Sequence, residues 1–112
     1  MTRQLQEKPE TYVCIGRQGD FPARLGKTVF VGEEEIAVFH LTDGRLFALQ
    51  NRSPHRKGGP LCEGMVSGDL LYDPLYDWKI NLLDGKVQAP DTGQVKTYPV
   101  KLEGEHVWIG LN

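Results

Sequence analysis

The sequence has few cysteines, no long apolar run and little net charge, and each absence excludes a class of protein. Its two cysteines, Cys14 and Cys62, stand far apart in 112 residues, so the chain is not a disulfide-rich scaffold. No apolar run approaches the ~18 residues of a membrane-spanning helix. The formal net charge of −2 gives no sign of nucleic acid or an anionic membrane as a partner.

Helical periodicity and an export signal are also missing. No segment keeps a period of 3.6 residues, so we expect little or no helix. Residues 1–10, MTRQLQEKPE, lack the apolar core of a signal peptide, and we expect them to form a flexible N-terminus. From these features we expect a cytoplasmic protein with two reduced thiols.

Short β-rich segments separated by turn residues make up the remainder of the chain. Thirteen glycines and seven prolines indicate many turns, and Asp-Gly pairs at 43–44 and 84–85 are typical of hairpins. Such spacing predicts an all-β fold, an antiparallel sandwich or small barrel, in one domain of residues 11–112. The predicted strands are residues 11–16, 27–31, 35–41, 45–50, 70–72, 77–81, 95–102 and 106–111.

Residues 51–80 interrupt this strand pattern and form a predicted inserted subdomain with two short loops. The first loop is Ser53-Pro54-His55, and the second is Asp73-Pro74-Leu75-Tyr76. Each loop places polar side chains beside a proline that stiffens the turn. Seventeen residues separate His55 from Asp73.

This two-loop frame and its flanking residues resemble the Rieske fold family, whose members hold a two-iron cluster with a C-x-H and a C-x-x-H motif. The chain resembles more closely the small subunit of the bacterial assimilatory NAD(P)H-dependent nitrite reductase. The likeness runs from about residue 11 to 111. The segments that carry it are residues 51–56, 58–61, 63–68, 73–79, 84–87 and 96–100.

Three of the four ligand positions implied by the resemblance are altered. Ser53 and Asp73 stand where cluster-binding members have cysteine, and Tyr76 stands where they have histidine, so only His55 remains. A Rieske cluster needs two thiolates and two imidazoles. A hydroxyl, a carboxylate and a phenol are poor substitutes for these ligands. We therefore expect no cofactor and no metal in this chain.

Two alternatives remain for the altered positions. The four side chains can hydrogen-bond to one another, and we expect His55 with Asp73 as the pair. A mononuclear metal site could instead combine these two residues with His40 or His106. We favour the first alternative because the frame supplies two of the three or four ligands that zinc requires.

The resemblance implies a function as a small, cofactor-free subunit without catalytic residues of its own. Its partner would be a large catalytic subunit carrying FAD, an iron–sulfur cluster and sirohaem, which reduces nitrite to ammonia in nitrate assimilation. The alternative is a Rieske-type [2Fe-2S] electron-transfer ferredoxin with atypical ligands. A third possibility is a free-standing metal-binding or regulatory module.

The loop ends carry the residues that we expect to contact the partner. Basic side chains around apolar ones are typical of non-obligate interfaces. Trp78 follows the second loop, and we expect it to pack in the core beneath the loops. The predicted contact residues are Arg52, Arg56, Lys57, Leu75 and Tyr76.

Overall fold

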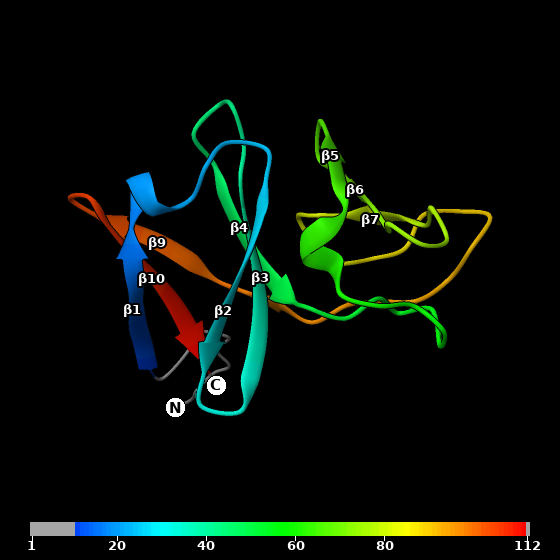
Figure 1. The fold of residues 1–112 in the computed structure, drawn as a ribbon, viewed down its shortest axis with the longest axis horizontal. Coiled ribbons are helices and arrows are strands. Elements are labelled where there is room, and N and C mark those ends of the chain that lie inside the picture. The colour runs from blue at the N-terminus through cyan, green and yellow to red at the C-terminus, as the bar shows by residue number, and fades with distance from the viewer. Residues whose placement is uncertain (1–10, 112) are drawn as a thin grey trace, which may run out of the picture.

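A computed structural model describes residues 11–111, and the expected flexible segment 1–10 lies outside the described residues. Ten strands and two short 3-10 helices follow one another within residues 11–111 (Figure 1). The strands are β1 Thr11–Arg17, β2 Gly26–Val31, β3 Glu34–His40, β4 Leu46–Gln50, β5 Met65–Ser67, β6 Leu70–Tyr72, β7 Lys79–Asn81, β8 Thr97–Tyr98, β9 Val100–Glu103 and β10 His106–Leu111. The 3-10 helices are η1 Gln18–Asp20 and η2 Leu61–Glu63.

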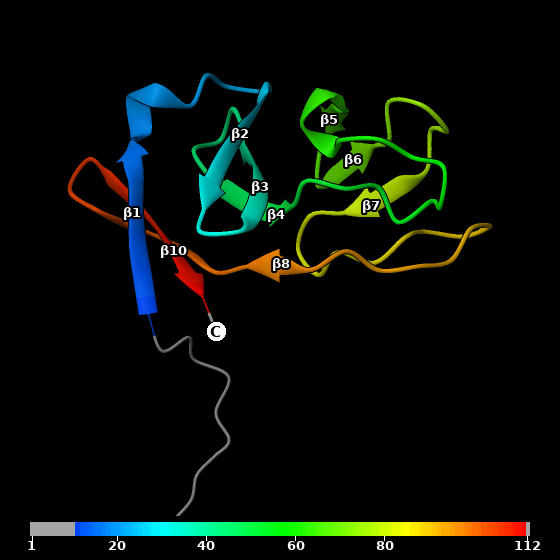
Figure 2. The same cartoon turned by 60° about the horizontal axis from the view of Figure 1, so that its bottom comes forward.

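The strands form three antiparallel sheets, which confirms the predicted all-β class. The strand orders are β1-β10-β9, β2-β3-β4-β8 and β5-β6-β7. The third sheet lies in the chain between β4 and β8, which pair with each other. It therefore projects from one side of the other two sheets (Figure 1). The connection from β7 to β8 extends along this projecting part before it returns to β8 (Figure 2).

Strand β3 is buried on both faces and separates two hydrophobic clusters. Side chains alternate between the faces of a strand, so Ile36 and Val38 pack in one cluster with Val107 and Ile109 of β10. Ala37 and Phe39 face the other cluster, which contains residues of β5, β6 and β7. Each fully buried valine, isoleucine or phenylalanine side chain stabilises the fold by about 1.5–3 kcal/mol. The second cluster fixes the projecting sheet, and hence the two loops, to the remainder of the molecule.

Several strand boundaries differ from the sequence predictions. The strand predicted over 95–102 is divided into β8 and β9 at Pro99, because proline has no N–H for the ladder. Strand β7 begins at Lys79 rather than residue 77, since Asp77 adopts a left-handed φ of 59°. Strand β5 was not predicted, because Val66 is its one β-branched residue and Met65 and Ser67 give no strand signal.

Two other expectations concern the thiols and membrane helices. Cys14 and Cys62 are both free, and Cys14 is exposed. Among residues 11–111, no helix is long and apolar enough to cross a membrane.

Candidate functional site

The structure brings the two loops together through a buried hydrogen bond between two of the altered positions. The Ser53 hydroxyl donates to Asp73 Oδ2 over 3.0 Å. Only 4% of Ser53 and 2% of Asp73 are exposed. Backbone N–H groups complete the arrangement, with His55 donating to Ser53 Oγ over 3.2 Å and Leu75 donating to Asp73 Oδ1 over 3.3 Å. The predicted pairing within this group is confirmed, but through Ser53 rather than His55.

His55 makes ring contacts in place of the expected bond to Asp73. Its Nδ1 accepts the Lys57 backbone N–H over 3.0 Å. Its ring stacks on Tyr76 with centroids 3.8 Å apart and an interplanar angle of 6°. Trp78 meets the same ring edge-on at 4.9 Å. The prediction for Trp78 was therefore wrong in part: this side chain lies beneath the loops but is only half-buried, because it packs on His55 rather than in a core cluster.

Backbone bonds give each loop its shape. In the first loop, Ser53 N–H donates to the Gly59 carbonyl and Gly58 N–H donates to the His55 carbonyl. A Cβ at Gly58 would lie 2.3 Å from the Ser53 Cβ, so this position must be glycine. In the second loop, Asp73 N–H donates to the Trp78 carbonyl over 2.8 Å.

The donor set at the loops does not fit a Rieske cluster. The four positions provide one imidazole, one hydroxyl, one carboxylate and one phenol, whereas the cluster needs two thiolates and two imidazoles. Cys62 lies on η2, where its N–H donates to Asn51 Oδ1 over 2.8 Å. Cys14 lies on β1 in a different sheet. Neither thiol stands at one of the four ligand positions of the two loops.

The histidines considered for a metal site do not join His55 and Asp73. His40 lies on β3, and its Nδ1 is 2.7 Å from the Phe21 carbonyl oxygen. His106 is exposed at the start of β10. Within residues 11–111, no three His, Cys, Asp or Glu side chains converge as metal ligands do. Neither histidine therefore completes a ligand set with His55 and Asp73.

Asn51 is a site residue that the sequence reasoning missed. Its side chain is 6% exposed, and its Nδ2 donates to Glu35 Oε2 over 2.9 Å and to Thr28 Oγ1 over 3.2 Å. With the Cys62 contact, it joins β2, β3 and η2 at the entrance to the first loop. One asparagine before a basic residue carries no sequence signal for this role.

A second polar cluster lies beside this junction. The Tyr98 hydroxyl donates to Glu34 Oε1, and the Lys96 ammonium lies 3.5 Å from the same oxygen. The Tyr98 hydrogen bond, followed by the charge of Lys96, lowers the pKa of Glu34. Burial, followed by the bond to Glu34, raises the pKa of Tyr98.

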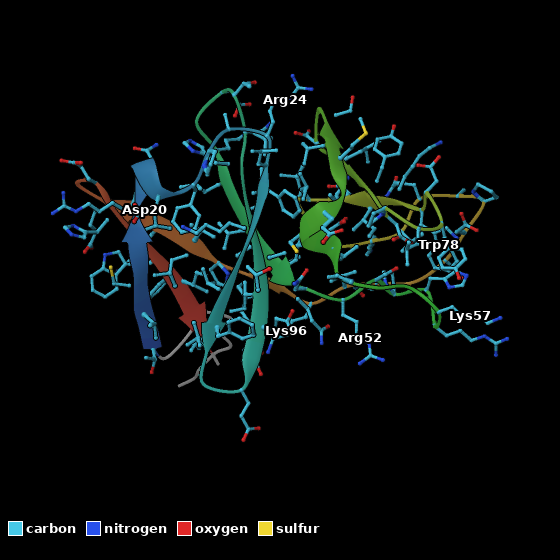
Figure 3. All side chains as sticks on the ribbon, viewed as in Figure 1. Asp20, Arg24, Arg52, Lys57, Trp78 and Lys96 are labelled. Atoms are coloured by element: carbon cyan, nitrogen blue, oxygen red, sulfur yellow. The ribbon has the colours of Figure 1, made fainter. Side chains whose placement is uncertain are left out.

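The predicted contact residues do not all lie at the loop ends. Lys57 lies at the far end of the loops near Trp78, whereas Arg52 lies closer to the sheets (Figure 3). Arg52 lines a 410 Å³ cavity with Glu33, Glu34 and Glu35. Leu75 and Tyr76 are 64% and 42% exposed. We call Arg56, Lys57, Leu75 and Tyr76 the tip surface.

The β fold, the two-loop frame and the paired loops together define a Rieske-like domain. The chain belongs to the Rieske-like [2Fe-2S] domain family, whose sequence profile matches residues 11–110. This match confirms the resemblance found in the sequence.

Two relatives and one solved structure are similar to this chain. It is 33% identical over 115 residues to the nitrite reductase [NAD(P)H] large subunit of Klebsiella oxytoca, matching 95% of this chain but spanning only 11% of that protein. It is 32% identical to the ferredoxin component of the Pseudomonas aeruginosa naphthalene 1,2-dioxygenase system, covering 75% of this chain and 80% of that one. Its fold is similar, with a TM-score of 0.82 at 18% identity, to a structure described as an NADH-dependent nitrite reductase small subunit from Mycobacterium tuberculosis, covering 91% and 96% of the two chains.

Proposed function

We propose that this chain is a small, cofactor-free subunit of a cytoplasmic NAD(P)H-dependent nitrite reductase. It docks on a large catalytic subunit that carries FAD, an iron–sulfur cluster and sirohaem and reduces nitrite to ammonia. In this role the chain stabilises or positions the catalytic subunit and transfers no electrons.

The Klebsiella oxytoca relative supports the identity of the partner. A region similar to 95% of this chain lies within a nitrite reductase large subunit there. A domain tethered to a catalytic chain is held at high effective concentration, whereas a separate chain needs an interface strong enough to hold it. The separate small subunit of our proposal would therefore need a docking surface.

The donor set at the loops is the observation that carries the cofactor-free proposal. The Ser53–Asp73 hydrogen bond and the His55–Tyr76 stack occupy the positions that would hold iron. These contacts connect the two loops without a cluster, so the loops keep a defined shape for docking. Electron transfer through this chain would require a redox centre that these side chains do not supply.

The tip surface is the docking site in this proposal. Arg56 and Lys57 are exposed on the first loop, and Leu75 and Tyr76 are exposed on the second. The His55–Tyr76 stack joins the two loops, and a combination of basic and apolar groups is typical of non-obligate interfaces. The complementary surface of the partner would be apolar with an acidic rim. Steering by opposite charges would make association faster at low ionic strength.

Co-purification with the large subunit, followed by a nitrite reduction assay with and without this chain, tests the proposal. We expect a stable complex, and we expect removal of this chain to reduce the stability or rate of the enzyme. Absence of a complex between folded partners would contradict the proposal.

A Rieske-type electron-transfer ferredoxin is the second candidate. It is favoured by the 32% identity to a dioxygenase ferredoxin component, 80% of which this chain covers. Iron, acid-labile sulfide and visible absorption in the purified chain would support this candidate over the first.

A further inference from the structure

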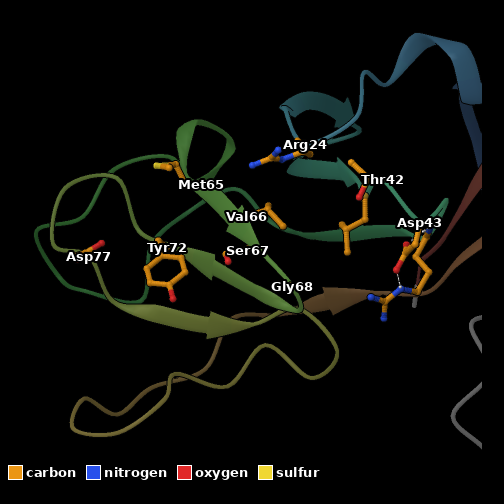
Figure 4. A pocket seen from close by; sticks show the side chains of 11 residues that line it. Arg24, Thr42, Asp43, Met65, Val66, Ser67, Gly68, Tyr72 and Asp77 are labelled. Carbon is orange, nitrogen blue, oxygen red and sulfur yellow. Dashed lines mark hydrogen bonds and ion pairs between the residues drawn. The ribbon is translucent and has the colours of Figure 1, made fainter.

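A cavity lies between the projecting sheet, Arg24 and the turn of residues 41–45 that connects β3 to β4. It has a volume of 590 Å³. One wall is the whole of β5 with Gly68, and the opposite wall carries Arg24 and Thr42 (Figure 4). Leu41 also lines the cavity. We call this cavity the β5 groove. Its size is within the usual range of ligand sites, about 300–1,000 Å³.

Among residues 11–111, the outer backbone edge of β5 has no partner strand, and β5 lines the groove. It is the outer strand of the sheet β5-β6-β7, and Val66 stands opposite Leu71 on β6. The pattern of hydrogen bonds between β6 and β7 follows from the bond that Asp73 N–H donates to the Trp78 carbonyl, just beyond the ends of these two strands. Hydrogen-bonded and non-hydrogen-bonded pairs alternate along antiparallel strands, so the backbone of Leu71 bonds to Ile80 on β7. The pair of Leu71 and Val66 is therefore a non-hydrogen-bonded pair. Val66 consequently directs its N–H and C=O away from β6.

Arg24 is the cation that faces this edge. Its backbone adopts a left-handed φ of 70°, and its N–H donates to the His40 carbonyl over 2.6 Å. The guanidinium makes no hydrogen bond or ion pair within residues 11–111, and its side chain extends over the groove toward Met65 (Figure 4). A left-handed backbone conformation costs free energy at a non-glycine residue, and such residues cluster at functional sites.

The other charged side chains of the groove are either paired with each other or distant from Arg24. Arg45 is already bonded to Asp43 at 2.9 Å and to Asp69 at 2.6 Å. Asp77 lies on the far side of Met65 from Arg24, at the end of the groove opposite to Asp43 (Figure 4). Met65, between them, is 73% exposed, and a thioether side chain adapts to varied apolar partners. A ligand with an acidic group beside Arg24 is therefore favoured.

We propose that the β5 groove binds an extended segment of the large subunit, which adds to β5 as a further strand and places a carboxylate on Arg24. This inference rests on the proposed function for the identity of the partner. An added strand supplies an acceptor for Val66 N–H and a donor for its C=O, which is the usual mode of strand addition. Because β5 has three residues, the carboxylate on Arg24 and the apolar contact with Met65 contribute much of the affinity.

Hydrogen exchange of the chain, alone and in complex with the large subunit, tests the added strand. We expect the Val66 amide to exchange at least about tenfold more slowly in the complex, because it gains a hydrogen bond. The Leu71 amide is bonded within the sheet in both states and serves as the internal reference.

Charge reversal tests the role of Arg24 independently. Arg24→Glu is expected to weaken the complex by about tenfold or more, since it removes a charge-assisted contact. Arg17→Glu on β1 makes the same charge change outside the groove and should leave the affinity unchanged. Circular dichroism of both variants verifies that they are folded.

The outcomes separate the two proposals. Absence of any complex contradicts the proposed function and this inference with it. A complex in which Val66 is unprotected and Arg24→Glu binds like the wild type refutes the groove alone. A carboxylate small molecule that binds at Arg24 without protecting Val66 would also refute the added strand.

Discussion

Removing the hydroxyl of Ser53 should destabilise the fold measurably. Ser53→Ala deprives the buried Asp73 carboxyl group of its 3.0 Å donor and leaves the His55 N–H without its acceptor. Hydrogen bonds to charged groups contribute about 1.5–3 kcal/mol each. We therefore expect the free energy of unfolding to fall by about 1.5–3 kcal/mol, which corresponds to a decrease of roughly 4 °C in Tm per kcal/mol for a domain of this size.

Urea unfolding of a double-mutant cycle measures this bond directly. Ser53→Ala, Asp73→Ala and the double variant should show a coupling energy of about 1–2 kcal/mol. Ser67→Ala, which removes an exposed hydroxyl on β5, should change stability by less than about 0.5 kcal/mol. Additive effects at Ser53 and Asp73, or a Ser53→Ala variant as stable as wild type, would refute the reasoning.

Three further predictions concern other parts of the structure. Reversing Arg56 and Lys57 to Glu should weaken binding to the large subunit without changing Tm, and calorimetric titration that finds the wild-type affinity would move the interface elsewhere. Gly58→Ala should destabilise by about 1–3 kcal/mol through overpacking, whereas Gly19→Ala, where nothing lies within 4 Å, should not; equal unfolding midpoints for the two variants would contradict this. Because the pKa of Tyr98 is raised, its contribution to stability is present below the unfolded value near ~10 and falls as the pH rises further. Tyr98→Phe should therefore flatten the alkaline loss of Tm, and an unchanged pH profile would count against that origin.

The sequence was sufficient to predict the all-β class and the two adjoining loops. Alternating β-branched residues and Asp-Gly turns depend on local chemistry, so they can be read without the fold. The break at Pro99 follows from the same local rules, although the predicted strand over residues 95–102 ran through this proline. Short β5 left no periodic pattern and became visible only in its pairing with β6.

The contacts within the site could not be assigned from residue types alone. Ser53, His55 and Tyr76 were all possible partners of Asp73, and chemistry favoured the imidazole. The backbone instead directs the Ser53 hydroxyl inward and the His55 ring outward onto Tyr76. The role of Asn51 depends on strands distant in the sequence, so no local pattern indicated it.

Anaerobic reconstitution with iron and sulfide, followed by visible absorption spectroscopy, tests the cofactor-free claim most directly. The triple variant Ser53→Cys, Asp73→Cys, Tyr76→His restores all four ligand types in the frame and should take up a cluster, which makes it the positive control. The unmodified chain should remain colourless and still bind the large subunit. A brown, two-iron protein formed by the unmodified chain would contradict the account.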